Sequence, residues 1–124
     1  MTQINFKIYH NPRCSKSRKA LKIINSKTKE FRIIKYLEDG IDINELKSLL
    51  NSNKISKEEI IRTNESSYKE LKLPEKDLSV DETINYIKNF PILLQRPIIF
   101  KYRNNELVQS VIGRSSEIVL DLFK

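Results

Sequence analysis

The chain has 124 residues, which fits one domain spanning residues 1–124, and its 39% of hydrophobic residues can bury a core. No apolar run approaches the ~20 residues that cross a bilayer, and one cysteine excludes an internal disulfide framework. The net charge of +7 is compatible with nucleic-acid binding, but the lysines are spread along the chain and only two glycines are present. We therefore expect neither a nucleic-acid nor a membrane partner.

The first elements predicted are a strand and a helix that flank a short polar segment. Residues 4–9 alternate apolar and polar side chains, which is typical of a strand. After Pro12, small and apolar residues at positions 17, 20, 21 and 24 recur with the helical period. The segment between them holds the only histidine, His10, and the only cysteine, Cys14. Cys14 is therefore expected in the first turn of a helix that leaves the end of a strand.

This placement favours a reactive thiol. The unpaired N–H groups and the dipole of a helix N-terminus stabilise a thiolate. Such sites and nearby cations lower the cysteine pKa from about 8.5 to roughly 3.5–7.5. Arg13, Lys16 and Arg18 supply positive charge, and His10 adds more when it is protonated. The alternative is that Cys14 is a small buried hydrophobe. A reactive thiol without a partner suits a reducing compartment, so we expect a cytoplasmic protein.

Residues 31–37 predict a second strand, which would complete a βαβ unit with two parallel strands. Residues 42–90 read as helical throughout, and three capping-box patterns mark helix starts. These patterns are Asp42 with Glu45, Ser56 with Glu59, and Ser79 with Glu82. No linker separates this region from the rest, so we predict a helical insertion at about residues 41–91 within one domain.

The end of the chain returns to β structure. Residues 97–102 and 106–112 predict a hairpin, Gly113 ends it, and Ser115 caps a final helix. The element order βαβ, helices, ββα predicts an α/β protein with the mixed sheet of a thioredoxin-like (glutaredoxin-like) fold and a helical insertion.

Four motifs in chain order resemble the glutaredoxin-coupled arsenate reductases, and most closely an arsenate-reductase-like branch with the motif HNPRCSKSR. They are His10-Asn11-Pro12-x-Cys14-x-x-Ser17-Arg18, Ile61-Arg62-x-Asn64, Pro91-Ile92-Leu93-x-x-Arg96-Pro97-Ile98 and Gly113-Arg114-x-x-Glu117-x-Val119-Leu120. The matches span most of the chain. One departure is Ser115, which stands where these reductases usually have proline.

The resemblance implies a role for each residue of the site. Cys14 is the nucleophile, and Arg62, Arg96 and Arg114 bind the oxyanion. His10 lowers the thiol pKa, and Pro97 is a cis-proline that faces the active site. Taken alone, Arg62 also suits a solvated helix, Arg96 and Arg114 suit loops, and His10 suits a hydrogen bond within its loop.

Residue types and cysteine count are consistent with this chemistry. Guanidinium groups bind tetrahedral oxyanions such as arsenate bidentately. A thiolate that attacks arsenic forms an arseno-cysteine, which no second cysteine in the chain resolves. Ser17 stands where a C-x-x-C protein has its second thiol, and is expected to face the core. The resemblance therefore implies glutathione or a similar thiol as co-substrate and glutaredoxin as partner, with no metal and no bound cofactor.

Two other functions fit the same fold. The first is a glutathione-linked thiol oxidoreductase that acts on mixed disulfides. The second is a redox-responsive transcription regulator that binds RNA polymerase. The arginines favour arsenate reduction over the former, and serine at position 17 disfavours the latter, because such regulators typically use C-x-x-C.

Overall fold

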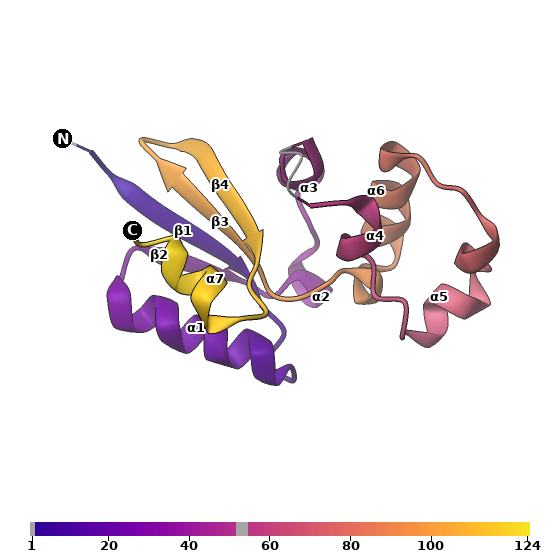
Figure 1. Cartoon of the computed structure of the whole chain (residues 1–124), viewed down its shortest axis with the longest axis horizontal. Coiled ribbons are helices and arrows are strands. Elements are labelled where there is room, and N and C mark those ends of the chain that lie inside the picture. Colours follow the sequence, from indigo (N-terminus) through magenta and orange to yellow (C-terminus); the bar gives the residue numbers. More distant parts are fainter. Residues whose placement is uncertain (1, 52–54) are drawn as a thin grey trace. The chain divides into compact units, whose positions relative to one another are not determined.

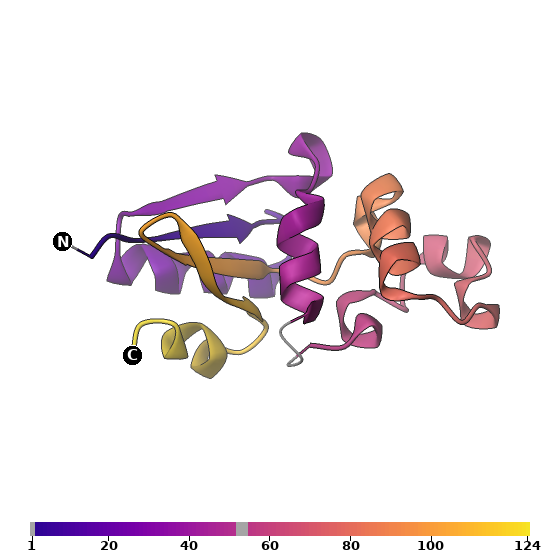
Figure 2. The ribbon, with the colours of Figure 1, turned by 90° about the horizontal axis from the view of Figure 1, so that it is seen from above.

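The strand predicted at the start of the chain, β1 (Ile4–Tyr9), lies inside a four-stranded sheet of order β2-β1-β3-β4. The computed structural model describes residues 2–51 and 55–124. These form two compact units, one of Met1–Asp39 with Arg96–Lys124 and one of Gly40–Gln95. The sheet belongs to the first unit (Figures 1 and 2).

The parallel partner of β1 is shorter than predicted. β2 covers Phe31–Ile34 and pairs parallel with β1, as expected. The prediction of a strand to residue 37 is wrong, because Tyr36–Asp39 form a helical turn, α2. The carbonyl of Lys35 accepts the N–H groups of Glu38 and Asp39, and the Asp39 carboxylate accepts the N–H of Lys35. Tyr36 is thereby buried against the ring of Tyr9, 6.2 Å away between centroids.

The predicted hairpin is present. β3 (Ile98–Arg103) pairs antiparallel with β1, and β4 (Glu106–Ile112) pairs antiparallel with β3. Asn104 and Asn105 connect the two strands with φ values of 50° and 68°. Positive φ at both central residues is the requirement of a type I′ turn, which asparagine tolerates better than most residues. Pro97 immediately precedes β3 and donates no hydrogen bond to the sheet.

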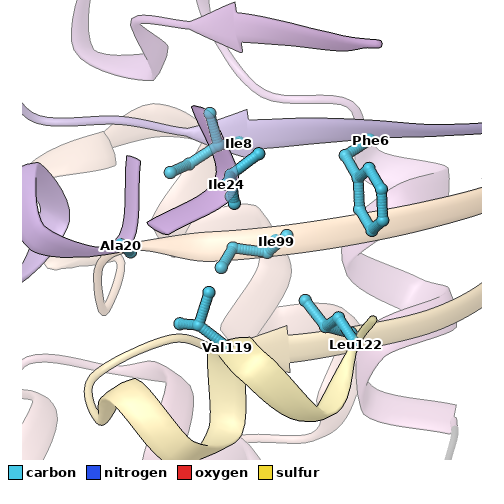
Figure 3. Packing of buried hydrophobic residues seen from close by; sticks show 7 residues of the cluster. All are labelled: Phe6, Ile8, Ala20, Ile24, Ile99, Val119 and Leu122. Atoms are coloured by element: carbon cyan, nitrogen blue, oxygen red, sulfur yellow. The ribbon is translucent and has the colours of Figure 1, made fainter. Parts of the chain in front are cut away.

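Two helices cover one face of this sheet, namely α1 (Ser15–Lys27) and α7 (Ser116–Asp121) (Figure 1). Their buried side chains meet the alternate residues of the central strands, as Figure 3 shows. The fully buried members of this core are Phe6, Ile8, Ala20, Ile24, Ile99, Val119 and Leu122. Ser115 Oγ accepts the N–H of Ile118 at 3.2 Å, so the predicted cap of the last helix is present.

The second unit consists of short helices. They are α3 (Ile43–Asn51), α4 (Lys57–Ile60), α5 (Ser66–Glu70) and α6 (Val80–Asn89), with the 3₁₀ turns η1 (Leu73–Glu75) and η2 (Pro91–Leu93). The prediction of helix throughout residues 42–90 is therefore too coarse. An isolated bridge between Ile61 and Leu94 and the left-handed residue Lys72 (φ 58°) interrupt the helices.

Local capping fixes where these helices begin. Ser56 and Ser79 form complete capping boxes with Glu59 and Glu82, as predicted. Asp42 accepts the N–H groups of Asn44 and Glu45 at 2.8 and 3.2 Å. The helical region matches the insertion predicted at residues 41–91, whereas its membership of one domain with the sheet stays a prediction.

No helix in residues 2–51 and 55–124 is both long enough and apolar enough to cross a bilayer.

Candidate active site

The loop that follows β1 is held in a tight turn. The N–H of His10 makes a ladder bond to Ile34 O at 2.9 Å, and the chain then leaves the sheet. Asn11 accepts twice: its side chain from the N–H of Arg13 and its carbonyl from the N–H of Cys14, each at 3.0 Å. An asparagine side chain that bonds two residues ahead is an Asx turn, which redirects the chain into α1.

Cys14 is the N-cap residue of α1, one residue before the first turn in which it was predicted. Its backbone is extended (φ −94°, ψ 121°), and its carbonyl accepts the first helical bond from Arg18. The thiol makes no side-chain capping hydrogen bond. Cys14 is half-buried and is a free cysteine.

The surroundings of Cys14 favour the thiolate. Burial raises the pKa of the thiol, but the N–H of Ser17, the guanidinium of Arg96 and the N–H of Lys16 together lower it more. The net pKa of Cys14 therefore lies below its ordinary value. Both a helix N-terminus and an arginine contribute, and the arginine comes from a distant part of the sequence.

Arg96 is positioned by its neighbour in the next motif. The guanidinium Nη1 of Arg114 donates to the carbonyl of Arg96 at 2.7 Å. The N–H of Gly113 donates to the carbonyl of Pro97 at 2.8 Å. The Arg96–Pro97 peptide bond is cis, which is the geometry that the family resemblance implies. The two hydrogen bonds to the carbonyls of Arg96 and Pro97 join the segment that enters β3 to the segment that leaves β4.

Close packing requires glycine at position 113, where the segment that leaves β4 lies beside the segment that enters β3. A Cβ atom built on it would lie 2.7 Å from Ile99 Cδ1, 3.2 Å from Val119 Cγ2 and 3.4 Å from Pro97 Cγ. The first distance is shorter than real Cβ contacts show, so any larger residue would displace the core beside the Arg96 segment.

His10 and Ser17 form a buried polar pair beneath the loop. His10 Nδ1 and Ser17 Oγ share a hydrogen bond of 2.6 Å, and Ser17 Oγ also accepts the N–H of Asn11 at 3.1 Å. Burial, followed by the charges of Lys35 and Arg18, holds the pKa of His10 below 6.5. The neutral form of His10 therefore predominates at pH 7. Its predicted influence on the thiol stays a prediction, with Ser17 as the structural link.

Arg62, the third predicted oxyanion ligand, belongs to the second unit. Its Nε donates to Glu65 Oε1 at 3.0 Å and its Nη1 to Gln95 Oε1 at 2.9 Å. Its N–H bonds to the carbonyl of Leu93. The first unit brings together Cys14, Arg96 and Arg114 with Pro97 and the His10–Ser17 pair, whereas the oxyanion role of Arg62 stays a prediction.

Asn11 is a site residue whose role the sequence reasoning missed. It is buried, and its side chain, N–H and carbonyl all hold the loop that carries Cys14. The signal available was the dipeptide Asn-Pro between a strand and a helix, which favours a turn.

Comparison with known proteins shows the family of this chain. The model of the ArsC family matches residues 9–122. The chain belongs to the ArsC family. It is 36% identical over 120 residues to an arsenate reductase of Escherichia coli, which covers 97% of this chain and 82% of the relative. It is 37% identical over 119 residues to the Escherichia coli K12 protein YfgD, covering 94% of each chain.

A solved structure agrees with the fold. The arsenate reductase from Vibrio cholerae superposes with a TM-score of 0.80 at 34% identity, covering 96% of this chain and 98% of that one. The ArsC-family chain therefore has the mixed α/β, thioredoxin-like fold of these reductases.

Proposed function

We propose that this ArsC-family protein is an arsenate reductase in which the Cys14 thiolate attacks arsenate and an external thiol completes the reaction. The observation that carries the proposal is the Arg96 guanidinium acting on a Cys14 thiol whose pKa lies below its ordinary value, at the N-terminus of α1. The names of the relatives support arsenate as the substrate.

The first step is a displacement at arsenic. The thiolate of Cys14 forms a sulfur–arsenic bond, and one arsenate oxygen leaves as water after protonation. Arsenic remains in the +5 state. Arg96 neutralises the oxyanion, and the N–H groups at the start of α1 add donors for its oxygens. Arg114 fixes the Arg96 backbone and, with Arg62, supplies the other guanidinium groups of the proposed oxyanion site.

The second step needs sulfur from solution, because the chain has one cysteine. An external thiolate attacks the Cys14 sulfur and forms a disulfide with it. The sulfur–arsenic bond breaks, and its electron pair leaves with arsenic, which is reduced from +5 to +3. The two sulfurs together lose these two electrons. A second thiol then attacks the mixed disulfide and releases the Cys14 thiolate.

Glutathione is the thiol that we propose for the first attack, and a glutaredoxin supplies the thiol of the second attack, which removes glutathione from Cys14. The family resemblance supports this choice, as does Ser17, whose hydroxyl cannot form a disulfide. The reducing thiol would keep the protein active in the cytoplasm.

The proposal is tested by arsenate-dependent NADPH oxidation with glutathione, glutaredoxin and glutathione reductase. We expect turnover with the native protein and none with Cys14→Ser. Turnover that Cys14→Ser retains, or an absence of turnover with a correctly folded native protein, would contradict the proposal. Rapid reduction of a mixed disulfide without arsenate turnover would instead favour the thiol oxidoreductase.

A further inference from the structure

A small polar pocket lies in the first unit between the first half of α1 and the start of α7, which run side by side (Figure 1). Its polar lining consists of Lys16, Lys19, Arg114, Ser115 and Ser116, and we call it the basic pocket. Its volume of about 90 Å³ equals that of about three water molecules. It therefore has room for a carboxylate group but not for a whole peptide.

The lining of the basic pocket is positively charged. Two lysines and one arginine contribute to it, and none of the described residues that line it is acidic. Glu117, in the first turn of α7, is exposed and lies outside this lining. The hydroxyl groups of Ser115 and Ser116 add hydrogen-bonding capacity, so the pocket suits an anion.

The pocket adjoins the reactive loop through covalent and hydrogen-bonded links. Lys16 is two residues after Cys14, and Lys19 is five residues after it, which is about 7 Å along the helix axis. Lys16 Nζ donates to the carbonyl of Arg114 at 3.5 Å, and the guanidinium of Arg114 donates to the carbonyl of Arg96. A molecule bound at Cys14 that extends toward α7 would reach this pocket.

We propose that the basic pocket binds a carboxylate of the external thiol, so that the co-substrate is an anionic low-molecular-weight thiol. This inference specifies the co-substrate of the proposed function, and it rests on that function because the proposed reaction requires an external thiol. Binding of the carboxylate would place the attacking sulfur toward Cys14 and discriminate against neutral thiols. Of the two pocket lysines, Lys19 is the better probe, since it is five residues from Cys14, whereas Lys16 is two residues away and its N–H contributes to the lowered pKa of Cys14.

The test is the reaction of reduced protein with two symmetrical disulfides, glutathione disulfide and the neutral 2-hydroxyethyl disulfide. In each reaction the Cys14 thiolate forms a disulfide with one half, and the other half leaves as a thiolate with the electron pair of the broken bond. Stopped-flow rates are compared between native protein, Lys19→Gln and Lys27→Gln. Lys27 is the matched control, because it is in the last turn of α1, about 12 Å farther along the same helix.

We expect Lys19→Gln to slow the reaction with glutathione disulfide about two- to fivefold, the effect of one exposed ion pair. The rate with the neutral disulfide should not change, and Lys27→Gln should leave the ratio of the two rates as in the native protein. The Cys14 titration curve of Lys19→Gln should also match that of the native protein.

Equal slowing with both disulfides, or no slowing with either, would overturn the inference. Because these exchanges contain no arsenate, the two proposals fail separately. Loss of arsenate turnover with the charge preference intact would reject only the proposed function.

Discussion

At the scale of single residues, the chemistry of the site depends on opposing effects on one sulfur atom. Partial burial disfavours the Cys14 thiolate, whereas the N–H groups of Lys16 and Ser17 and the guanidinium of Arg96 favour it and prevail. Arg96 therefore has two proposed tasks, stabilising the nucleophile and binding the oxyanion. His10 shares a hydrogen bond with Ser17, and burial lowers its pKa, while its influence on the thiol stays a prediction.

The Cys14 thiol should ionise at a lower pH than an ordinary cysteine. Thiolate absorbance followed against pH, with Cys14→Ser as the blank, should give a midpoint below the ordinary thiol value of about 8.5. The thiolate is populated above this midpoint, so the rate of alkylation of Cys14 should rise through the same pH range. A midpoint at or above about 8.5 would contradict the assignment of Cys14 as the nucleophile.

Lysine at position 96 or 114 should not restore the function of arginine in binding arsenate. Arg96→Lys keeps the charge but loses the planar fork that binds two oxygens, and Arg114→Lys loses the same geometry. We expect each variant to lower kcat/KM for arsenate at least about tenfold, the effect of losing one charge-assisted hydrogen bond. Arg103→Lys, at the exposed end of β3, is the control. Native kcat/KM in both site variants would show that these arginines do not hold the oxyanion.

His10 should make the fold sensitive to mild acid. Its pKa is lower in the folded than in the unfolded chain, so its contribution to stability is present above pH 6.5 and is lost as pH falls through the folded pKa. Denaturant midpoints should therefore decrease in the native protein as the pH falls below about 6.5. His10→Asn should flatten this pH dependence, and an unchanged slope in that variant would reject the assignment.

At the scale of elements, the site is a crossing of two chain segments. The entry to β3 carries Arg96 and Pro97, and the exit from β4 carries Gly113 and Arg114. Backbone and guanidinium hydrogen bonds join the two segments. The short helix α7 then packs behind the crossing through Val119. The arginines are thus placed by the sheet and its hairpin, whereas the thiol is placed by the strand–helix loop.

Gly113→Ala should damage this crossing. The added Cβ would overlap Ile99 and crowd Val119, and overpacking of a core typically costs about 1–3 kcal/mol. The variant should show that loss in urea unfolding, and its folded fraction should also reduce arsenate with a lower kcat/KM. Val108→Ala, at an exposed position of β4, should change stability by less than about 0.5 kcal/mol. If Gly113→Ala were as stable as the native protein, the core would accept the added Cβ atom, and close packing would not require glycine at this position.

At the scale of the whole molecule, local patterns predicted the elements better than their limits. Alternation located β1, and capping boxes located the starts of α4 and α6, because both signals lie within a few residues. The end of β2 was missed because the aromatic residue Tyr36 suits a strand by composition, while Asp39 and Lys35 close a turn there. The prediction of helix throughout residues 42–90 missed the breaks at Ile61 and Lys72, because these depend on contacts and backbone geometry that no periodicity reveals.

The site was predictable only where its residues are close together in the sequence. The loop from His10 to Ser17 is local, so the placement of Cys14 at a helix start followed from the residues alone. The proximity of Arg96 to Cys14 joins distant parts of the chain, and only the family resemblance suggested it. The bond between His10 and Ser17 and the packing of Gly113 required coordinates, since neither has a signature in the sequence.

In the proposed reaction, Cys14 attacks arsenate and a thiol from solution resolves the arseno-cysteine. The most direct measurement is intact-mass spectrometry of the protein quenched with acid during arsenate turnover with limiting glutaredoxin and excess glutathione. We expect one glutathione adduct per chain, on Cys14, that appears only when arsenate is present, and little turnover with thioredoxin and its reductase alone. Full turnover with thioredoxin alone, without any adduct on Cys14, would contradict the proposed reaction.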